Sequence, residues 1–246
     1  MVESHPCIFI PDFEFMSLNW HFYPGRMPAV PFFCTSSRPV FPLLQIKAKG
    51  KNMNYNSKFH ELKSLYDSNL SEISIPGSDI VISNIEFISE TNPEGLVNNE
   101  DLLISENKKF TYPVFIPPYR ESDKVVLLLH GLNERSWVKY LTWAYFISIN
   151  TGSFVILFPI SFHINRSPSS WIDPRTMTGS VKERISKWNN VQMSSYANIA
   201  LSSRLSQDPM RFFHSGYQTA VDIIKLMEQI KGGNHLVIPA GSAVNI

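Results

Sequence analysis

The sequence predicts an α/β fold with three layers and a mostly parallel sheet. Residues 124–130 and 153–160 are short, continuously apolar runs, which is typical of strands buried on both faces of a parallel sheet. Residues 137–150, between them, have the length and composition of a helix. A strand–helix–strand unit of this size makes its two strands parallel, with a right-handed connection. With 246 residues, the chain is long enough for one sizeable core.

Residues 1–57 differ in composition from the rest and are interpreted as an arm and a connector. Seven of the 17 prolines fall within residues 1–45, together with many aromatic residues. Because proline blocks helices and aromatic rings favour burial, we expect an extended arm that packs over the domain. A partner-binding or substrate-covering segment is the alternative. Cys7 and Cys34, both in the arm, are interpreted as free thiols rather than a bridge.

Residues 58–246 are predicted to form the main domain. Phe59, Leu62 and Leu65 recur at helical spacing, so a short amphipathic helix is expected there. The Pro76-Gly77 pair marks a turn. Two strands, at residues 80–88 and 110–116, then precede the buried strand at 124–130.

The helix at 137–150 has clear boundary signals, and a long insertion follows the next strand. Ser136 is a candidate N-cap, and Gly152 is a candidate C-terminal stop. Residues 161–205 begin as an irregular stretch and contain one or two helices. An insertion of this length beside the carboxyl edge of a sheet is usually functional, often as a lid.

A strong helix is predicted after Asp208-Pro209, which supply a cap and a first helical residue. Apolar residues recur at three- and four-residue spacing along it and form one face, namely Met210, Phe213, Tyr217, Ala220, Ile224 and Met227. The helix ends at Gly232-Gly233. Residues 242–246 have the pattern of the start of a fifth strand.

Composition argues against several classes of function. The net charge of +1 and the lack of a long charge run give no indication of nucleic-acid binding. No signal peptide and no apolar segment of membrane-spanning length is recognised, so a cytoplasmic protein is expected. The seven histidines are scattered, and no Gly-rich phosphate loop follows a strand. No metal and no cofactor are therefore predicted.

The turn at His130-Gly131, together with the order of elements around it, resembles the first half of an α/β hydrolase. The sequence around Asn165–Pro168 and Trp171–Arg175 also resembles an uncharacterised α/β-hydrolase-like branch, a domain of unknown function. This resemblance implies a three-layer α/β-hydrolase-like sandwich, incomplete at its C-terminus. It further implies that the backbone N–H groups of Gly131 and Leu132 form an oxyanion hole, and that His130 orients the loop.

The resemblance also implies a function, esterase- or lipase-like hydrolysis of a small-molecule ester or similar acyl bond by a serine. No G-x-S-x-G motif occurs, so no catalytic residue is assigned in this chain, and the nucleophile, acid and histidine are expected beyond Ile246. The alternative is a non-catalytic binding scaffold or inactive fragment, with 161–205 as the recognition surface. Its candidate substrate-side residues are Arg166, Trp171, Asp173 and Arg175. The oligomeric state is left open, and a bare sheet edge predicts poor solubility or binding of hydrophobic dyes.

Overall fold

The computed structural model describes residues 54–90, 101–118, 120–131, 134–188 and 195–246. The chain divides into two units at Gln45, and all described residues belong to the second, Ile46–Ile246. The expected arm, with Cys7 and Cys34, lies outside the described residues, so both interpretations of it stay predictions. The expected connector ends earlier than residue 57, because the first described helix already begins at Tyr55.

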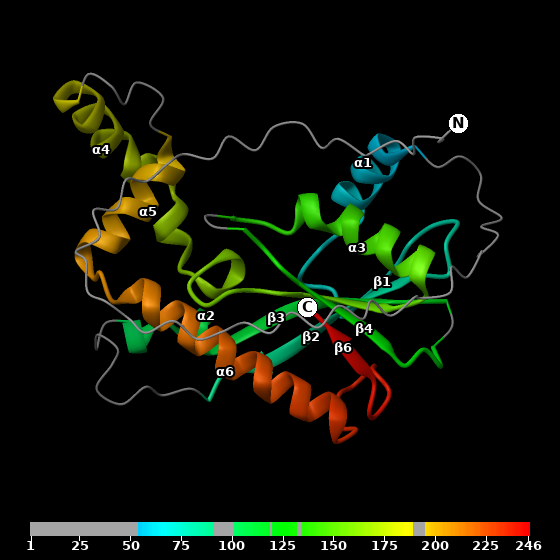
Figure 1. Cartoon of the computed structure of the whole chain (residues 1–246). Coiled ribbons are helices and arrows are strands. Elements are labelled where there is room, and N and C mark those ends of the chain that lie inside the picture. The colour runs from blue at the N-terminus through cyan, green and yellow to red at the C-terminus, as the bar shows by residue number, and fades with distance from the viewer. Residues whose placement is uncertain (1–53, 91–100, 119, 132–133, 189–194) are drawn as a thin grey trace, which may run out of the picture. The chain divides into compact units, whose positions relative to one another are not determined.

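Six strands form one open sheet in the order β1-β2-β3-β5-β4-β6 (Figure 1). The strands are β1 (Glu72–Ser74), β2 (Val81–Ile88), β3 (Lys109–Ile116), β4 (Lys124–Leu129), β5 (Phe154–Phe158) and β6 (Ala243–Asn245). The pairs β1-β2, β2-β3 and β3-β5 are antiparallel, whereas β4 pairs in parallel with both β5 and β6. The protein is therefore a mixed α/β fold. The expectation of a mostly parallel sheet is wrong, because the first half of the sheet is built from antiparallel neighbours.

The four longer strands agree with the predicted segments to within about two residues, and the parallel β4–β5 pair is confirmed. All five residues of β5 are buried. In β4, Val125 and Leu127 join the core on one face of the sheet, while Val126 and Leu128 pack on the other. The apolar runs thus predicted the centre of the sheet correctly, since central strands are covered on both faces.

Helices α1 (Tyr55–Leu65) and α3 (Val138–Thr151) cover one face of the sheet. Leu62 of α1 and Leu141 of α3, both without exposed surface, pack in one cluster with Val155 of β5. Gly152 ends α3 in the left-handed conformation, with φ of 66°, as predicted. The predicted cap at Ser136 is wrong, because α3 begins after Trp137 without a side-chain cap.

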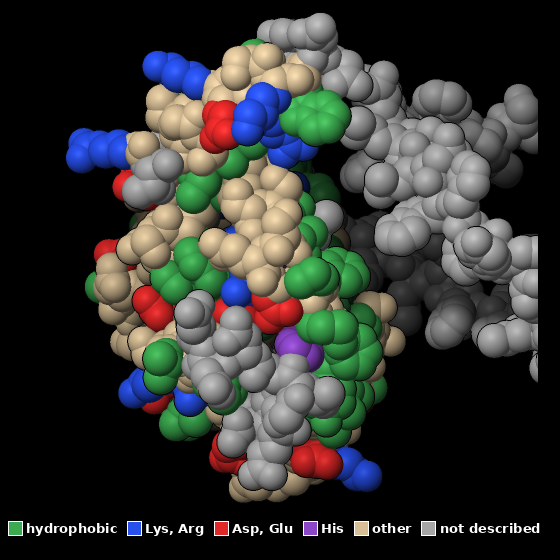
Figure 2. Space-filling model, turned by 90° about the vertical axis from the view of Figure 1, so that its left-hand side faces the viewer, with side chains coloured by type: hydrophobic (Ala, Val, Ile, Leu, Met, Phe, Trp, Pro, Cys, Tyr) green, Lys and Arg blue, Asp and Glu red, His purple; other side chains and the backbone are tan. Residues whose placement is uncertain are grey.

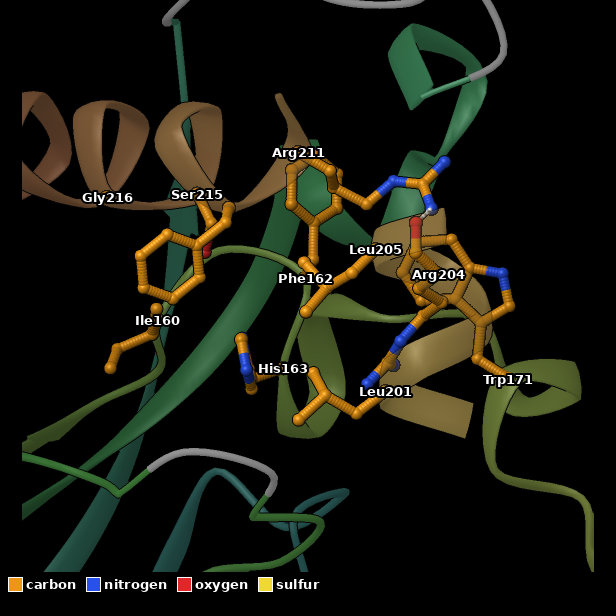
Figure 3. A pocket seen from close by; sticks show the side chains of 11 residues that line it. Ile160, Phe162, His163, Trp171, Leu201, Arg204, Leu205, Arg211, Ser215 and Gly216 are labelled. Atoms are coloured by element: carbon orange, nitrogen blue, oxygen red, sulfur yellow. Dashed lines mark hydrogen bonds between the residues drawn. The ribbon is translucent and has the colours of Figure 1, made fainter. Parts of the chain in front are cut away.

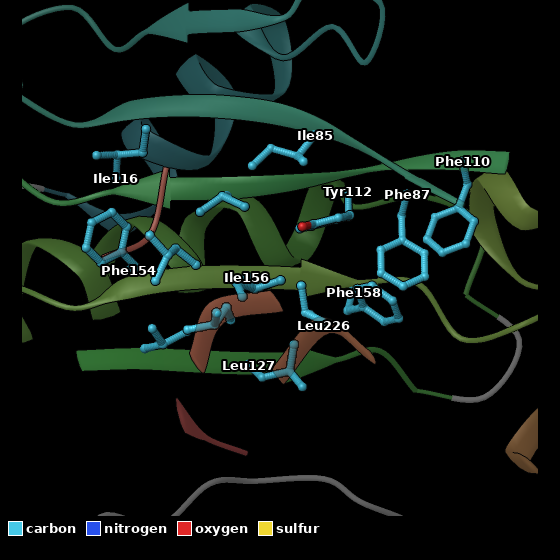
Figure 4. Packing of buried hydrophobic residues seen from close by; sticks show 14 residues of the cluster. Ile85, Phe87, Phe110, Tyr112, Ile116, Leu127, Phe154, Ile156, Phe158 and Leu226 are labelled. Carbon is cyan, nitrogen blue, oxygen red and sulfur yellow. The ribbon is translucent and has the colours of Figure 1, made fainter. Parts of the chain in front are cut away.

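Helix α6 (Arg211–Lys231) covers the opposite face. Near its C-terminal end, Leu226 and Ile230 pack on aromatic side chains of the strands (Figure 4). The Phe87 and Phe158 rings meet edge-on, with their centroids 5.3 Å apart. Edge-to-face contacts of this kind add to the free energy gained by burying the rings.

The apolar face that the sequence predicts for α6 is exposed to solvent and does not face the core. Met210, Phe213, Tyr217, Ile224 and Met227 are 39% to 56% exposed, and Ala220 is exposed as well. The inward face instead carries mostly polar residues over its first three turns, namely Arg211, His214, Ser215, Gln218, Thr219 and Asp222. Apolar periodicity normally marks the side of a helix that faces the core. Here the inward polar residues mostly have specific buried partners, which periodicity cannot reveal.

The insertion after β5 contains two short 3-10 turns and two helices, namely η2 (Ile164–Arg166), η3 (Ser169–Ile172), α4 (Pro174–Lys187) and α5 (Tyr196–Gln207). Two further short elements, η1 (Asp101–Leu103) and α2 (Ser105–Lys108), precede β3. Helices α4 and α5 lie beyond the end of the sheet, and Figure 2 shows basic side chains projecting at that upper end. Among the described helices, none combines the length and apolar character needed to cross a bilayer.

Candidate functional site

A pocket of about 260 Å³ lies just beyond the carboxyl end of β5 (Figure 3). Its walls come from the turn after β5, from η3, from α5 and from the first two turns of α6. The lining residues are mostly apolar and comprise Ile160, Phe162, His163, Trp171, Leu201, Arg204, Leu205, Arg211, Phe212, Ser215 and Gly216. We call this space the β5 pocket. Most of its wall lies within the 161–205 insertion, and Ile160 and α6 supply the rest.

The turn after β5 has an unusual backbone. Phe162 and Ile164 adopt positive φ angles of 65° and 50°. For bulky or β-branched residues such a conformation costs about 1–3 kcal/mol each and persists only where the surroundings impose it. Ser161 supplies part of that support, because its N–H donates to Thr219 Oγ1 at 3.0 Å. Strain of this kind is concentrated at binding and active sites.

Arg166 anchors the same turn from beneath. It is 0% exposed, and its Nη2 lies 2.8 Å from Asp222 Oδ2 of α6. It also donates to the carbonyl oxygens of Pro159 and Asn107, each at 3.1 Å, and its guanidinium stacks on the Phe110 ring. Burial lowers the pKa of Arg166 to about 10, so it stays protonated at neutral pH. Arg166 therefore ties the turn to α6, and its side chain exposes no surface to a substrate, contrary to expectation.

His163 lies between the two strained residues and lines the pocket. Its Nδ1 is 2.9 Å from the carbonyl oxygen of Ser161, and a carbonyl can only accept a hydrogen bond, so Nδ1 carries the proton. Nε2 is then an acceptor, and it is buried without a partner among the described residues. Burial lowers the pKa of His163, and the nearby cations Arg204 and Arg166 lower it further. At neutral pH the ring is neutral, with one unused lone pair.

Two arginines from α5 and α6 flank the Trp171 ring. The guanidinium of Arg204 is 5.1 Å from the ring centroid, and that of Arg211 is 5.2 Å away. Arg211 is neutralised by Asp101, with contacts of 2.6 and 2.8 Å. Burial lowers the pKa of Arg204, as do the neighbouring cations Arg211 and Arg135. In the part of the chain that the structure describes, Arg204 has no carboxylate partner.

The neighbouring turn after β4 is the one that the sequence singled out. His130 Nδ1 lies 2.9 Å from the carbonyl oxygen of Gly131, and Nε2 accepts the N–H of Ile160 at 2.9 Å. Burial lowers the pKa of His130 to about 4. The N–H of Gly131 donates to Tyr140 Oη at 2.7 Å, so this expected oxyanion donor is already engaged. The other expected donor, Leu132, lies outside the described residues.

The remaining predicted residues are dispersed. Trp171 stands in the wall of the β5 pocket, as described above. Asp173 caps α4, because its carboxylate accepts the N–H of Arg175 at 3.0 Å. Arg175 is exposed on α4 and does not line the pocket. Over the described ranges, no three His, Cys, Asp or Glu side chains gather to hold a metal ion.

Sequence reasoning missed Arg204 and did not recognise His163 as part of a pocket. Neither residue belongs to a motif, and their numbers in the chain are far apart. The one usable signal was the position of His163 directly after a buried strand, because ligands of open α/β sheets bind outside the carboxyl ends of strands. Arg204 gave no comparable signal, since a single arginine in a helix is usually a surface residue.

The fold and the β5 pocket define a mixed α/β protein with an apolar pocket at the carboxyl ends of its parallel strands. The chain belongs to the DUF6051 family, a family of unknown function whose model matches residues 53–246. No match was found among curated proteins. The expected membership of the α/β-hydrolase superfamily is therefore wrong, because the family found is DUF6051 and the sheet is mixed.

Proposed function

We propose that the protein is a non-catalytic scaffold that binds a small, mainly apolar molecule in the β5 pocket. The observation that carries this proposal is a cavity of about 260 Å³ whose wall is mostly apolar and includes the ring of His163. Small-molecule sites are usually apolar cavities of roughly 300–1,000 Å³ with a few polar groups that fix orientation. The β5 pocket is just below that range, so we expect a ligand with a chain of about eight carbons or a single ring.

Binding is favoured over catalysis by the hydrogen bonds around the pocket. Ser215 is the hydroxyl that lines it, and its Oγ donates to the carbonyl oxygen of Ser161 at 2.7 Å. The proton of Ser215 is therefore directed to the backbone and not to His163. A serine without a base at its hydroxyl is a weak nucleophile. Ester hydrolysis by residues beyond Ile246, the cytoplasmic location and the solubility of the isolated chain stay predictions.

Octan-1-ol tests this proposal, because its apolar chain matches the apolar wall of the β5 pocket. We expect saturable binding by isothermal titration calorimetry at a single site. Gly216 lies within α6 and lines the pocket, and a Cβ built there meets nothing within 4 Å. Gly216→Leu should therefore fill part of the cavity and abolish binding. The same change should stabilise α6 by about 0.5–1 kcal/mol, because glycine is a poor helix former.

Gly179→Leu is the matched control. Gly179 also lies inside a helix, α4, and a Cβ there likewise meets nothing within 4 Å, but it does not line the pocket. We expect Gly179→Leu to bind octan-1-ol like the natural chain. Equal binding by all three proteins, or no saturable binding by any of them, would contradict the proposal.

A further inference from the structure

We propose that the β5 pocket selects an anion, and that its ligand is a short-chain or aromatic carboxylate whose charged end binds Arg204. This inference rests on the proposed binding function and narrows it to one chemical class. It follows from an excess of positive charge on one side of an otherwise apolar cavity, and from the hydrogen-bond donors that this charge leaves unused.

The excess charge comes from three arginines that lie close enough to affect one another. Arg211 and Arg135 both lower the pKa of Arg204, which is half-buried. Asp101 neutralises Arg211. For Arg204 and Arg135, the described residues supply no carboxylate within ion-pair distance. Two half-buried like charges repel each other and lose hydration, and the attraction to an anion placed beside them offsets these costs.

Arg204 also has N–H groups that can donate hydrogen bonds to a ligand. Its guanidinium carbon lies 5.1 Å from the centroid of the Trp171 ring, within the range of a cation–π contact. No N–H of this guanidinium has a hydrogen-bond partner among the described residues. In Figure 3 the Arg204 guanidinium lies beside Leu201, with His163 across the pocket. A planar guanidinium edge matches a carboxylate, which accepts two parallel hydrogen bonds from it.

Arg211 provides an internal contrast. It stacks on the same tryptophan, yet its Nε and Nη2 are bound by Asp101 and its Nη1 by the carbonyl oxygen of Arg204. The Nε, Nη1 and Nη2 groups of Arg211 are thus all engaged within the protein. Arg204 makes the same contact with Trp171 but has no carboxylate partner among the described residues. The remaining wall, including Phe162, Leu201 and Leu205, is apolar. Such a wall selects an anion with an apolar body over a free inorganic ion.

The test compares octanoate with octan-1-ol, which have the same chain length, by calorimetry on the full chain at pH 7 and low ionic strength. The alcohol is the more hydrophobic of the two, so an apolar pocket alone would prefer it. We expect octanoate to bind at least about tenfold more tightly, since a hydrogen bond to a charged group is stronger than one between neutral groups. Arg204→Gln should remove this preference, so that octanoate then binds no more tightly than octan-1-ol does to the same variant.

Arg120→Gln is the control for a general loss of positive charge, because Arg120 is an exposed arginine just before β4, at the other end of the strands. It should retain the preference for octanoate. If octan-1-ol binds as tightly as octanoate, and Gly216→Leu blocks both, anion selection is overturned and the binding function stands. If Arg204→Gln retains the preference, the role of Arg204 is overturned. If neither compound binds, the proposed function fails and this inference fails with it.

Discussion

The turns after β4 and β5 lie side by side, with the rings of His130 and His163 only 5.3 Å apart, but they are built differently. In the turn after β4, both nitrogens of His130 and the N–H of Gly131 are engaged within the protein. In the turn after β5, two residues have strained backbones and His163 Nε2 is unpaired beside a pocket. We call the turn after β4 the closed turn, because the polar groups of its described residues His130 and Gly131 named above are engaged. We call the turn after β5 the open turn, because His163 Nε2 has no partner among the described residues.

The largest expected effect concerns the support of the open turn. Asp222→Asn removes the charge that pairs with Arg166, which is 0% exposed. Removing one partner of a buried ion pair usually costs about 3–5 kcal/mol, because the other charge stays buried without compensation. We expect a loss of this size in the free energy of unfolding, measured by urea denaturation.

Glu183→Gln is the control for this change. Glu183 pairs with Lys187 on the surface of α4, with both side chains more than 60% exposed. Exposed ion pairs are screened by solvent and contribute little to stability, so this substitution should have little effect. A loss at Asp222 as small as the loss at Glu183 would show that the strained turn does not depend on the buried pair.

The next largest effect is a pH dependence of the free energy of unfolding, which arises from His130 in the closed turn. Burial lowers the pKa of His130 from 6.5 to about 4 in the folded protein. Neutral His130 therefore stabilises the fold above pH 6.5, and this contribution disappears as the pH falls from 6.5 toward 4. Its full size is about 3 kcal/mol, since one pKa unit corresponds to about 1.36 kcal/mol.

Urea unfolding at pH 7 and at pH 4.5 measures this contribution. His235 has a similarly lowered pKa, so the natural chain contains at least two such groups. His130→Asn should therefore show a smaller loss of stability between the two pH values than the natural chain. An identical loss in both proteins would mean that His130 is not held neutral by its surroundings.

A third prediction compares the same kind of substitution, histidine to alanine, in each of the two turns. His130→Ala leaves the N–H of Ile160 and the carbonyl oxygen of Gly131 without their side-chain partner, and such losses cost about 1–3 kcal/mol for each buried group. His163→Ala breaks only the contact with Ser161 and removes an acceptor that had no described partner. We expect His130→Ala to lower the melting temperature more. The reverse order would contradict the distinction between a closed and an open turn.

The smallest effect is expected at Arg204. Its neighbours Arg211 and Arg135 disfavour its charge, so Arg204→Gln relieves repulsion while losing the stacking on Trp171. These terms oppose each other, and we expect the melting temperature of the ligand-free protein to change little, by the equivalent of about 1 kcal/mol or less. A charged residue that adds no stability to the ligand-free protein is expected where binding requires it. A loss as large as that of Asp222→Asn would instead mark Arg204 as structural.

Local patterns predicted much of the fold. The apolar runs of β4 and β5, the helix between them and the stop at Gly152 were predicted correctly, because each depends on neighbouring residues alone. The direction of the pairs β1-β2, β2-β3 and β3-β5 was predicted wrongly, because a mostly parallel sheet was expected and these pairs are antiparallel. The antiparallel β3–β5 pair joins segments about 40 residues apart, and no local signal fixes that pairing.

Helix α6 and the site show why the rest was not predicted. The buried face of α6 is polar because Asp222 meets Arg166 and Gln218 meets Asn107, both contacts between residues distant in sequence. The same holds for the pocket, where Arg204 becomes a candidate ligand residue because Asp101 pairs with the neighbouring Arg211 and not with Arg204. A local excess of positive charge depends on which residues meet in the folded protein. It therefore cannot be recognised in a sequence whose total charge is nearly balanced.

A crystal structure of the complex with octanoate tests the central claim most directly, because it distinguishes the two turns in one experiment. The account predicts that the carboxylate lies against the guanidinium of Arg204, with the chain between Phe162 and Leu205. Octanoate bound at the turn after β4, against Gly131 and Tyr140, would contradict it and return the candidate site to the turn that the sequence first indicated.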